Sequence, residues 1–204
     1  MNTVNLENKK VKPSKIVCVG RNYVKHIEEL GNAIPDQMVV FNKPNSSISN
    51  RLQSYNQESL HYEAEICFLI QNKKLAAVGV GLDLTKRELQ SKLKEKGLPW
   101  ERAKAFDGSA VFSHFIPLTG FNLDDLSLEL LINGVKVQSG HVNEMLYPPR
   151  VILQELSSYT TLQTNDLIMS GTPSGVGQIQ KGDIFTGRVK CASEVIVEAE
   201  WVAE

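Results

Sequence analysis

Two apolar segments that follow each other closely constrain the fold of this chain most strongly. Residues 63–70 end in the uninterrupted run Ile66-Cys67-Phe68-Leu69-Ile70, and residues 77–82 form a second run after the polar residues Gln71-Asn72-Lys73-Lys74. Short apolar runs bounded by turn residues are typical of buried strands. We therefore expect two strands here, with the carboxylates of residues 63 and 65 at the start of the first.

Strands dominate the remaining pattern, and helices are few and short. Further strands are expected at residues 16–20, 39–41, 126–132, 135–138, 167–169, 184–185 and 195–197. Asn133-Gly134 is the pair most favoured in a two-residue type I′ hairpin turn. The chain therefore belongs to the mixed α+β class and is mainly β.

Three helices are predicted from spacing and from end signals. The first covers Tyr23 to Leu30 and is closed by Gly31-Asn32, and the third covers Pro149 to Leu156. The second follows Asp83, where Thr85 and Glu88 have the spacing of a capping box and Gly97 ends the helix. The long polar stretch from Asn45 to Ser59 is expected to be a mobile loop.

The length and charge of the chain limit the classes of protein to which it can belong. A chain of 204 residues suits one domain over residues 15–204, preceded by a polar segment over residues 1–14. The balance of 22 basic and 23 acidic residues gives no reason to expect nucleic acid as a partner. No apolar run has the length of a membrane span. The polar start and three cysteines without C-x-x-C spacing favour the cytoplasm.

Three carboxylates form the clearest candidate for chemistry. Strand alternation places Glu63 and Glu65 on one face, roughly 6.5 to 7 Å apart along the strand. Asp83 follows the next apolar run, where a strand meets the start of a helix. Three carboxylates near one another suit Mg²⁺ or Mn²⁺, which prefer oxygen ligands. The alternative is a solvated strand end without a metal.

Six short blocks, in order, resemble the signatures of the fumarylacetoacetate hydrolase family. They are Gly20-Arg21-Asn22-Tyr23, Tyr62-Glu63-Ala64-Glu65, Leu82-Asp83-Leu84-Thr85, Lys96-Gly97-Leu98-Pro99-Trp100, Ala103-Lys104-Ala105-Phe106 and Ser170-Gly171-Thr172-Pro173-Ser174-Gly175-Val176-Gly177. The Lys96 to Trp100 block resembles the branch of acylpyruvases and oxaloacetate decarboxylases. The sequence differs from many relatives at Lys86-Arg87-Glu88, although the arginine stays in register.

The resemblance implies a fold, a cofactor and a set of site residues. It implies a β-sandwich roll with a few short helices, a homodimer, and one Mg²⁺ or Mn²⁺ held by Glu63, Glu65 and Asp83. The lysine near the metal corresponds to Lys104. The residues expected to bind substrate are Arg21, Gln90, Gly171 and Thr172.

The same branch carries a histidine and a glutamate that match His26 and Glu29, three residues apart on one helical face. Such a pair can activate a water molecule, although from the sequence alone an ordinary surface pair is the alternative. The expected function is metal-dependent cleavage of a carbon–carbon bond in acylpyruvate-type 2,4-dioxo acids, with decarboxylation of oxaloacetate as a related activity. Two alternatives remain: a 2-hydroxy-dienoate isomerase or oxaloacetate tautomerase on the same fold, and a non-catalytic β-fold binding module.

Overall fold

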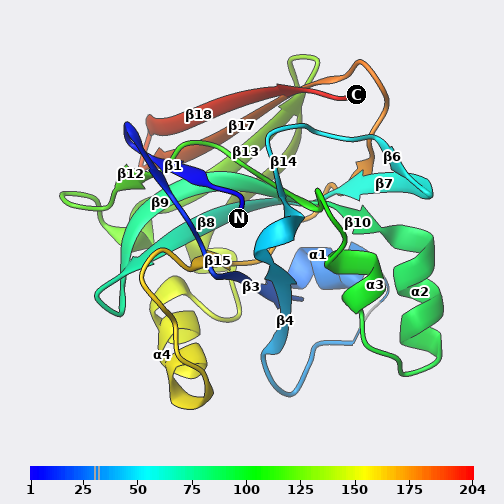
Figure 1. Cartoon of the computed structure of the whole chain (residues 1–204), viewed down its shortest axis with the longest axis horizontal. Helices are drawn as coiled ribbons and strands as arrows, with labels where there is room; N and C mark the ends of the chain where they lie inside the picture. Colours follow the sequence, from blue (N-terminus) through cyan, green and yellow to red (C-terminus); the bar gives the residue numbers. More distant parts are fainter. Residues whose placement is uncertain (30, 32) are drawn as a thin grey trace.

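A computed structural model describes residues 1–29, 31 and 33–204, and its largest element is an eight-stranded sheet (Figure 1). The sheet contains β3 (Lys15–Gly20), β4 (Val39–Pro44), β5 (Ile48–Ser49), β8 (Ala64–Gln71), β9 (Lys74–Asp83), β11 (Ala110–Phe112), β12 (Ile116–Pro117) and β15 (Leu167–Met169). Their order is β4-β3-β15-β8-β9-β11-β5, and β12 pairs with β9. The two strands predicted first, β8 and β9, therefore lie in the middle of this sheet.

A second sheet of four strands lies across one face of the first (Figure 1). It contains β13 (Leu126–Ile132), β14 (Val135–His141), β17 (Ile184–Cys191) and β18 (Glu194–Val202), in the order β14-β13-β17-β18. Asn133 and Gly134 both have positive φ between β13 and β14. The predicted type I′ hairpin is thus confirmed.

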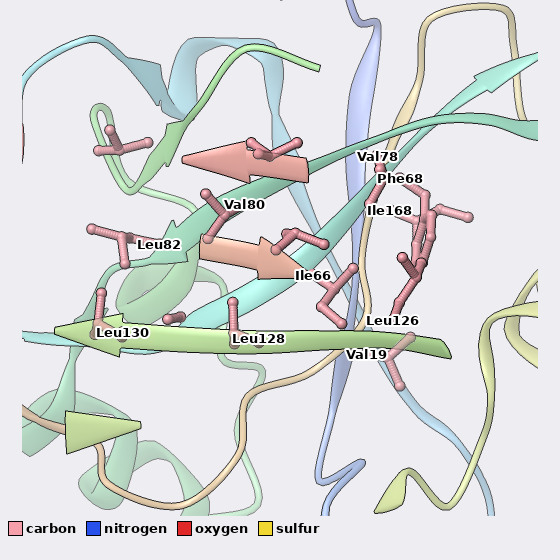
Figure 2. Close-up of a cluster of buried hydrophobic side chains, with 14 of the residues drawn as sticks. Val19, Ile66, Phe68, Val78, Val80, Leu82, Leu126, Leu128, Leu130 and Ile168 are labelled. Atoms are coloured by element: carbon pink, nitrogen blue, oxygen red, sulfur yellow. The ribbon is translucent and has the colours of Figure 1, made fainter. Parts of the chain in front are cut away.

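Strand alternation gives the large sheet two buried faces. One face packs against β13 of the second sheet, and Figure 2 shows side chains of both sheets meeting there, among them Ile66, Phe68, Val80, Leu82, Leu128 and Leu130. The other face carries a smaller core that includes Cys18, Cys67 and Met169. Glu65 lies on this second face, because it is two residues before Cys67.

Two glycines in β9 allow neighbouring side chains to pack closely against the second face of the sheet next to the carboxylates. Gly81 pairs with Glu65 and Gly79 pairs with Cys67. A Cβ atom at position 81 would lie 2.7 Å from Cys67 Sγ and 2.8 Å from Phe112 Cδ1. The sulfur and the aromatic ring therefore occupy the space that a side chain at this position would need.

Among the described residues, the remaining short elements are two small sheets, four α-helices and three 3-10 helices. β1 (Val4–Leu6) pairs with β2 (Lys9–Val11), and β7 (Glu58–Tyr62) pairs with β6 (Tyr55–Asn56), β10 (Thr85–Lys86) and β16 (Gly177–Gln178). The helices are α1 (Val24–Glu29), α2 (Arg87–Glu95), α3 (Glu101–Lys104), α4 (Pro149–Tyr159), η1 (Asn45–Ser47), η2 (Leu123–Asp125) and η3 (Val142–Glu144). Val4 of the N-terminal hairpin is buried in the second core.

Two local predictions are wrong. The stretch from Asn45 to Ser59 is not one long loop, because it contains η1, β5 and β6 and buries Ile48 and Leu52 in the two cores. Its polar composition concealed these few anchoring side chains.

The predicted capping box before α2 is also absent from the described structure. Thr85 lies in β10, and its hydroxyl accepts a hydrogen bond from Lys104. The Glu58 carboxylate caps α2 instead, by accepting from the backbone N–H groups of Glu88 (3.0 Å) and Leu89 (3.3 Å). A cap supplied by a distant strand leaves no signal in the local sequence.

The three predicted helices themselves are largely confirmed, and α2 ends just before Gly97 as expected. α4 begins at Pro149 as expected and extends to Tyr159, and α1 covers most of the predicted first helix. Leu30 was expected to be the last residue of this helix, and Asn32 was expected to be part of its stop signal. Both residues lie outside the described residues. Within the described residues, the helices are too short or too polar to span a membrane.

Candidate metal centre and substrate pocket

The three predicted carboxylates meet where β8 begins and β9 ends. Glu65 is the second residue of β8, Asp83 is the last residue of β9, and Glu63 lies just before β8. The N–H of Asp83 donates to the carbonyl of Glu63 at 2.8 Å, which holds the two chain segments side by side. One carboxylate oxygen from each residue lies within 4.8 Å of the others, and all three side chains are buried.

Lys104 lies among these carboxylates. It is the last residue of α3 and is 2% exposed. Its Nζ donates to Glu63 Oε2 at 2.8 Å, to Asp83 Oδ2 at 2.7 Å and to Thr85 Oγ1 at 2.6 Å. Three acceptors match the three protons of an ammonium group, so the buried charge is fully hydrogen-bonded.

Two further cations balance the cluster. Arg87, at the start of α2, pairs with Glu63 and donates to Gln90 Oε1 at 2.8 Å. Lys43 on β4 is completely buried, and its Nζ lies 2.8 Å from Asp83 Oδ1. That contact is an ion pair outside hydrogen-bonding geometry, since Asp83 Oδ1 has no hydrogen-bond partner among the described residues. Three carboxylates thus face three cations.

The carboxylates differ in electrostatic surroundings. Burial raises the pKa of Glu63, but the charges of Lys104 and Arg87 outweigh this effect and hold the pKa below its usual value. Burial and the nearby charge of Asp83 raise the pKa of Glu65 well above its usual value, against the hydrogen bond from Gly171 N. Glu65 therefore lacks the cationic partner that Glu63 has.

The cluster fits a small divalent cation. Carboxylate oxygens are the ligands that Mg²⁺ and Mn²⁺ prefer. At a Mg²⁺–oxygen distance of about 2.1 Å, octahedral ligands lie roughly 3 to 4.2 Å apart. The three oxygens here lie within 4.8 Å of one another. A cation would also offset the charge that raises the pKa of Glu65 and would offer Asp83 Oδ1 a partner.

One pocket brings these carboxylates together with most of the other predicted site residues. Its lining includes the predicted Arg21, His26, Gln90, Lys104 and Thr172, together with Phe41, Arg87, Lys94 and Trp100. Gly171 contributes its backbone, because its N–H donates to Glu65 Oε2 at 2.6 Å. Gly171 has a φ of +102°, and a Cβ atom there would lie 2.7 Å from Asn22 Cβ, so this position requires glycine.

The pocket lining also carries positive groups next to the carboxylates. Arg87, Gln90 and Lys94 follow at intervals of three and four residues, which places them on one face of α2. The Arg21 guanidinium lies 5.8 Å from the centre of the Trp100 ring. Burial and the charges of Arg21 and Arg87 lower the pKa of Lys94, which shows that these positive groups share one region.

His26 and Glu29 are in contact as predicted. His26 Nδ1 lies 3.2 Å from Glu29 Oε2, and His26 is 6% exposed. The other oxygen of Glu29 accepts a hydrogen bond from the N–H of Gly175 at 2.9 Å. α1 is thereby tied to the loop after β15, and the imidazole is held at the pocket.

Sequence reasoning missed Lys43, Lys94, Trp100 and Gln138 as site residues. The spacing of Arg87, Gln90 and Lys94 was a signal available in the sequence for the cationic face of α2. Lys43 and Gln138 gave no such signal. Each is a polar residue in a strand, and its hydrogen-bond partners come from segments that are distant in the sequence.

Comparisons with known proteins support the resemblance. Residues 15–197 match the family described as fumarylacetoacetate (FAA) hydrolase C-terminal. The oxaloacetate tautomerase YcgM of Escherichia coli is 40% identical over 190 residues, which cover 85% of this chain and 87% of the relative. The chain therefore belongs to the fumarylacetoacetate hydrolase family, which is a family of enzymes.

Solved structures show the same fold. A crystal structure from Oleispira antarctica is 35% identical and superposes with a TM-score of 0.94 over the full length of both chains. The fumarylpyruvate hydrolase of Pseudomonas aeruginosa, crystallised with Mn²⁺ and pyruvate, is 25% identical and has a TM-score of 0.88, covering 99% of this chain and 95% of its own. The expected mainly β sandwich roll is thus confirmed.

Proposed function

We propose that this protein is a metal-dependent enzyme that interconverts the keto and enol forms of oxaloacetate or a similar dicarboxylic 2-oxo acid. The observation that carries the proposal is the polarity of the pocket, where a buried carboxylate cluster lies next to Arg21, Arg87 and Lys94. The carboxylates suit a divalent cation and the positive groups suit carboxylates of the substrate. The 40% identity to an oxaloacetate tautomerase favours this reaction over the hydrolysis that the sequence resemblance placed first.

Mg²⁺ or Mn²⁺ would be held by Glu63, Glu65 and Asp83. When bound, the cation supplies Lewis acidity, which stabilises negative charge on the 2-oxo group. Lys104 donates hydrogen bonds to Glu63 and Asp83, and its own pKa is raised because these two carboxylates outweigh the effect of burial.

The remaining residues bind the substrate and move its proton. Arg21 and Lys94 attract the C4 carboxylate, which is the carboxylate distant from the 2-oxo group, while the amide of Gln90 and the hydroxyl of Thr172 hold the polar atoms nearer that group. His26 takes a proton from C3, and the protonated imidazole returns this proton to the C2 oxygen, which completes the enol. Glu29 stabilises the protonated imidazole, since its carboxylate contacts Nδ1 and leaves Nε2 for the transfer.

Hydrolysis of an acylpyruvate is the second candidate, and the contact between His26 and Glu29 favours it. In that reaction His26 would deprotonate water, whose hydroxide adds to the acyl carbon. The bond from that carbon to C3 then breaks, and C3 takes up a proton, which gives pyruvate and a carboxylic acid. The similarity to a fumarylpyruvate hydrolase supports this candidate.

Three assays on one preparation distinguish the candidates. They follow the ultraviolet absorbance of enol-oxaloacetate, pyruvate release from oxaloacetate, and pyruvate release from acetylpyruvate, each with Mg²⁺, with Mn²⁺ and after chelation. We expect rapid loss of the enol signal in the presence of metal, and we expect Glu63→Gln but not the exposed Glu194→Gln to abolish it. If the protein releases pyruvate from acetylpyruvate and shows neither of the other two activities, it is a hydrolase. Turnover that survives complete chelation would contradict the metal site.

Assembly and location are further parts of the proposal. We propose a homodimer that acts in the cytoplasm on a small 2-oxo acid, without nucleic acid or membrane partners. Light scattering at micromolar concentration tests the dimer directly, and a monomer mass under assay conditions would exclude it.

A further inference from the structure

Gln138 is a buried amide whose hydrogen bonds all lead toward the pocket. It is 1% exposed on β14, although Lys136 and Ser139 of the same strand are exposed. Its Nε2 donates to Thr172 Oγ1 and to the carbonyl of Pro173, each at 2.8 Å. Its Oε1 accepts from the backbone N–H of Ala64 at 3.0 Å.

These partners fix the orientation of the amide. The Pro173 carbonyl can only accept and the Ala64 N–H can only donate, so the nitrogen must face Pro173 and the oxygen must face Ala64. A buried amide without hydrogen-bond partners would destabilise the fold, because it would lose its contacts with water and gain none in the protein. Here every partner belongs to a segment that builds the metal centre or the substrate side of the pocket.

The hydrogen bonds of Gln138 connect the two chain segments that hold Glu65. Ala64 precedes Glu65, so Gln138 holds the peptide from which that side chain leaves the backbone. At the other end Gln138 holds Thr172, and the adjacent Gly171 N–H donates to the Glu65 carboxylate. Glu65 is thus fixed at its backbone and at its carboxylate by two segments that meet at one side chain.

Glycines allow the loop after β15 to lie against β14. A Cβ atom at Gly140 would lie 2.8 Å from Pro173 Cβ, and a Cβ atom at Gly175 would lie 2.0 Å from the carbonyl oxygen of Val137. Gly175 also has a φ of +99°. Close approach of the two backbones is what brings the Thr172 hydroxyl within reach of Gln138.

The direction of the bond to Thr172 matters for the substrate. The hydroxyl accepts from Gln138, so its proton stays available for an acceptor, and its contact with the Pro173 carbonyl is long at 3.4 Å. A hydroxyl that accepts one hydrogen bond becomes a better donor in the next. Thr172 lines the pocket, where the carboxylate or 2-oxo oxygen of the substrate is such an acceptor.

We propose that Gln138 is a positioning residue that aligns the Thr172 hydroxyl with the substrate and the Glu65 carboxylate with the metal. It does not touch the reacting atoms. The effect on substrate binding rests on the proposed function, whereas the effect on Glu65 and on Ala64 does not.

The first test compares the near-isosteric Gln138→Met with Gln163→Met, an exposed glutamine in the turn before β15. We expect Gln138→Met to raise KM about tenfold or more with a smaller change in kcat, to weaken Mn²⁺ binding in calorimetry, and to speed hydrogen exchange at the Ala64 amide. Gln163→Met should change none of these. Gln138→Asn, which keeps the amide but is one methylene shorter, should act in the same direction with a smaller effect.

The second test asks whether Gln138 acts through Thr172. A double-mutant cycle combines Gln138→Met with Thr172→Val, and we expect the KM of the double variant to match that of the worse single variant. Fully additive effects on KM would overturn the proposal, as would an unchanged KM in Gln138→Met. If the wild-type protein turns over none of the substrates, the proposed function fails. The inference about Gln138 is then tested separately, and it is overturned if Gln138→Met has the same hydrogen exchange at the Ala64 amide and the same Mn²⁺ affinity as wild type.

Discussion

Asp166 and the three pocket carboxylates are all buried, but among the described residues Asp166 accepts five hydrogen bonds, whereas each pocket carboxylate accepts one or two. Asp166 Oδ1 accepts from the N–H and hydroxyl of Ser14 and from the N–H of Lys15. Its Oδ2 accepts from Lys15 Nζ and from the N–H of Gln163, each at 2.9 Å. This arrangement joins the starts of β3 and β15, two adjacent parallel strands.

The pocket carboxylates are arranged differently. Glu65 has a raised pKa and Asp83 Oδ1 has no hydrogen-bond partner among the residues described, even though three cations lie nearby. A carboxylate whose role is to join strands can have all its acceptor positions occupied by hydrogen-bond donors of the protein. The pocket cluster instead has as many nearby cations as carboxylates but leaves Glu65 without an ion-pair partner among the described residues, and a bound metal ion can supply that partner.

Glu65→Gln should separate activity from stability most strongly. We expect metal-dependent activity to fall by about 10³-fold, or about 4 kcal/mol, because a metal ligand is lost. The melting temperature measured in chelator should not fall, since the glutamine oxygen still accepts from Gly171 and a repulsion with Asp83 is removed. Enzyme kinetics and calorimetry give the two values, and Glu194→Gln on the surface is the matched control.

Asp166→Asn should show the opposite behaviour. We expect a loss of about 3 kcal/mol in the free energy of unfolding, because buried donors including the Lys15 ammonium lose their charged acceptor. The kcat and KM of the folded enzyme should be unchanged. Urea unfolding measures the loss, with the exposed Asp124→Asn as control, and a large fall in kcat without loss of stability would contradict the distinction between the two clusters.

The stability supplied by Asp166 should depend on pH. Burial raises the pKa of this carboxyl, but hydrogen bonds from Ser14, Lys15 and Gln163 outweigh burial and hold the pKa below its usual value. A lowered pKa in the folded state means that the stabilisation is complete above the unfolded pKa of about 3.9 and is lost as the pH falls through the folded value. The difference in unfolding free energy between wild type and Asp166→Asn should therefore be constant near neutral pH and shrink below about pH 4. A difference that grows on acidification would have the wrong sign.

The smallest effect concerns the positive groups of the pocket. Lys94→Met and Arg21→Met should each raise KM for oxaloacetate by about tenfold, equivalent to about 1.4 kcal/mol, because the distant carboxylate loses a positive partner. KM for a 2-oxo acid without that carboxylate should change much less. Lys92→Met, exposed on the same helix, is the control. Equal changes for both substrates would mean that these cations do not select dicarboxylates.

The sequence alone determined the longer strands of the two larger sheets, the hairpin at Asn133-Gly134 and the identity of the three carboxylates. These features depend on side-chain alternation, local turn chemistry and short motifs, all of which are visible within a few neighbouring residues. The prediction of a loop over residues 45–59 failed because two buried side chains, Ile48 and Leu52, anchor a largely polar segment.

Only the tertiary structure decided how the site is held together. The Lys43 contact with Asp83, the Glu58 cap on α2 and the Gln138 bonds to Ala64 and Thr172 all join segments far apart in the chain. The role of each of these side chains depends on a partner that is distant in the sequence and becomes a neighbour only on folding. No local sequence pattern indicates which residue that partner is. The sequence thus specified most of the groups that line the candidate site, and the packing of distant strands specified their electrostatic surroundings and direction.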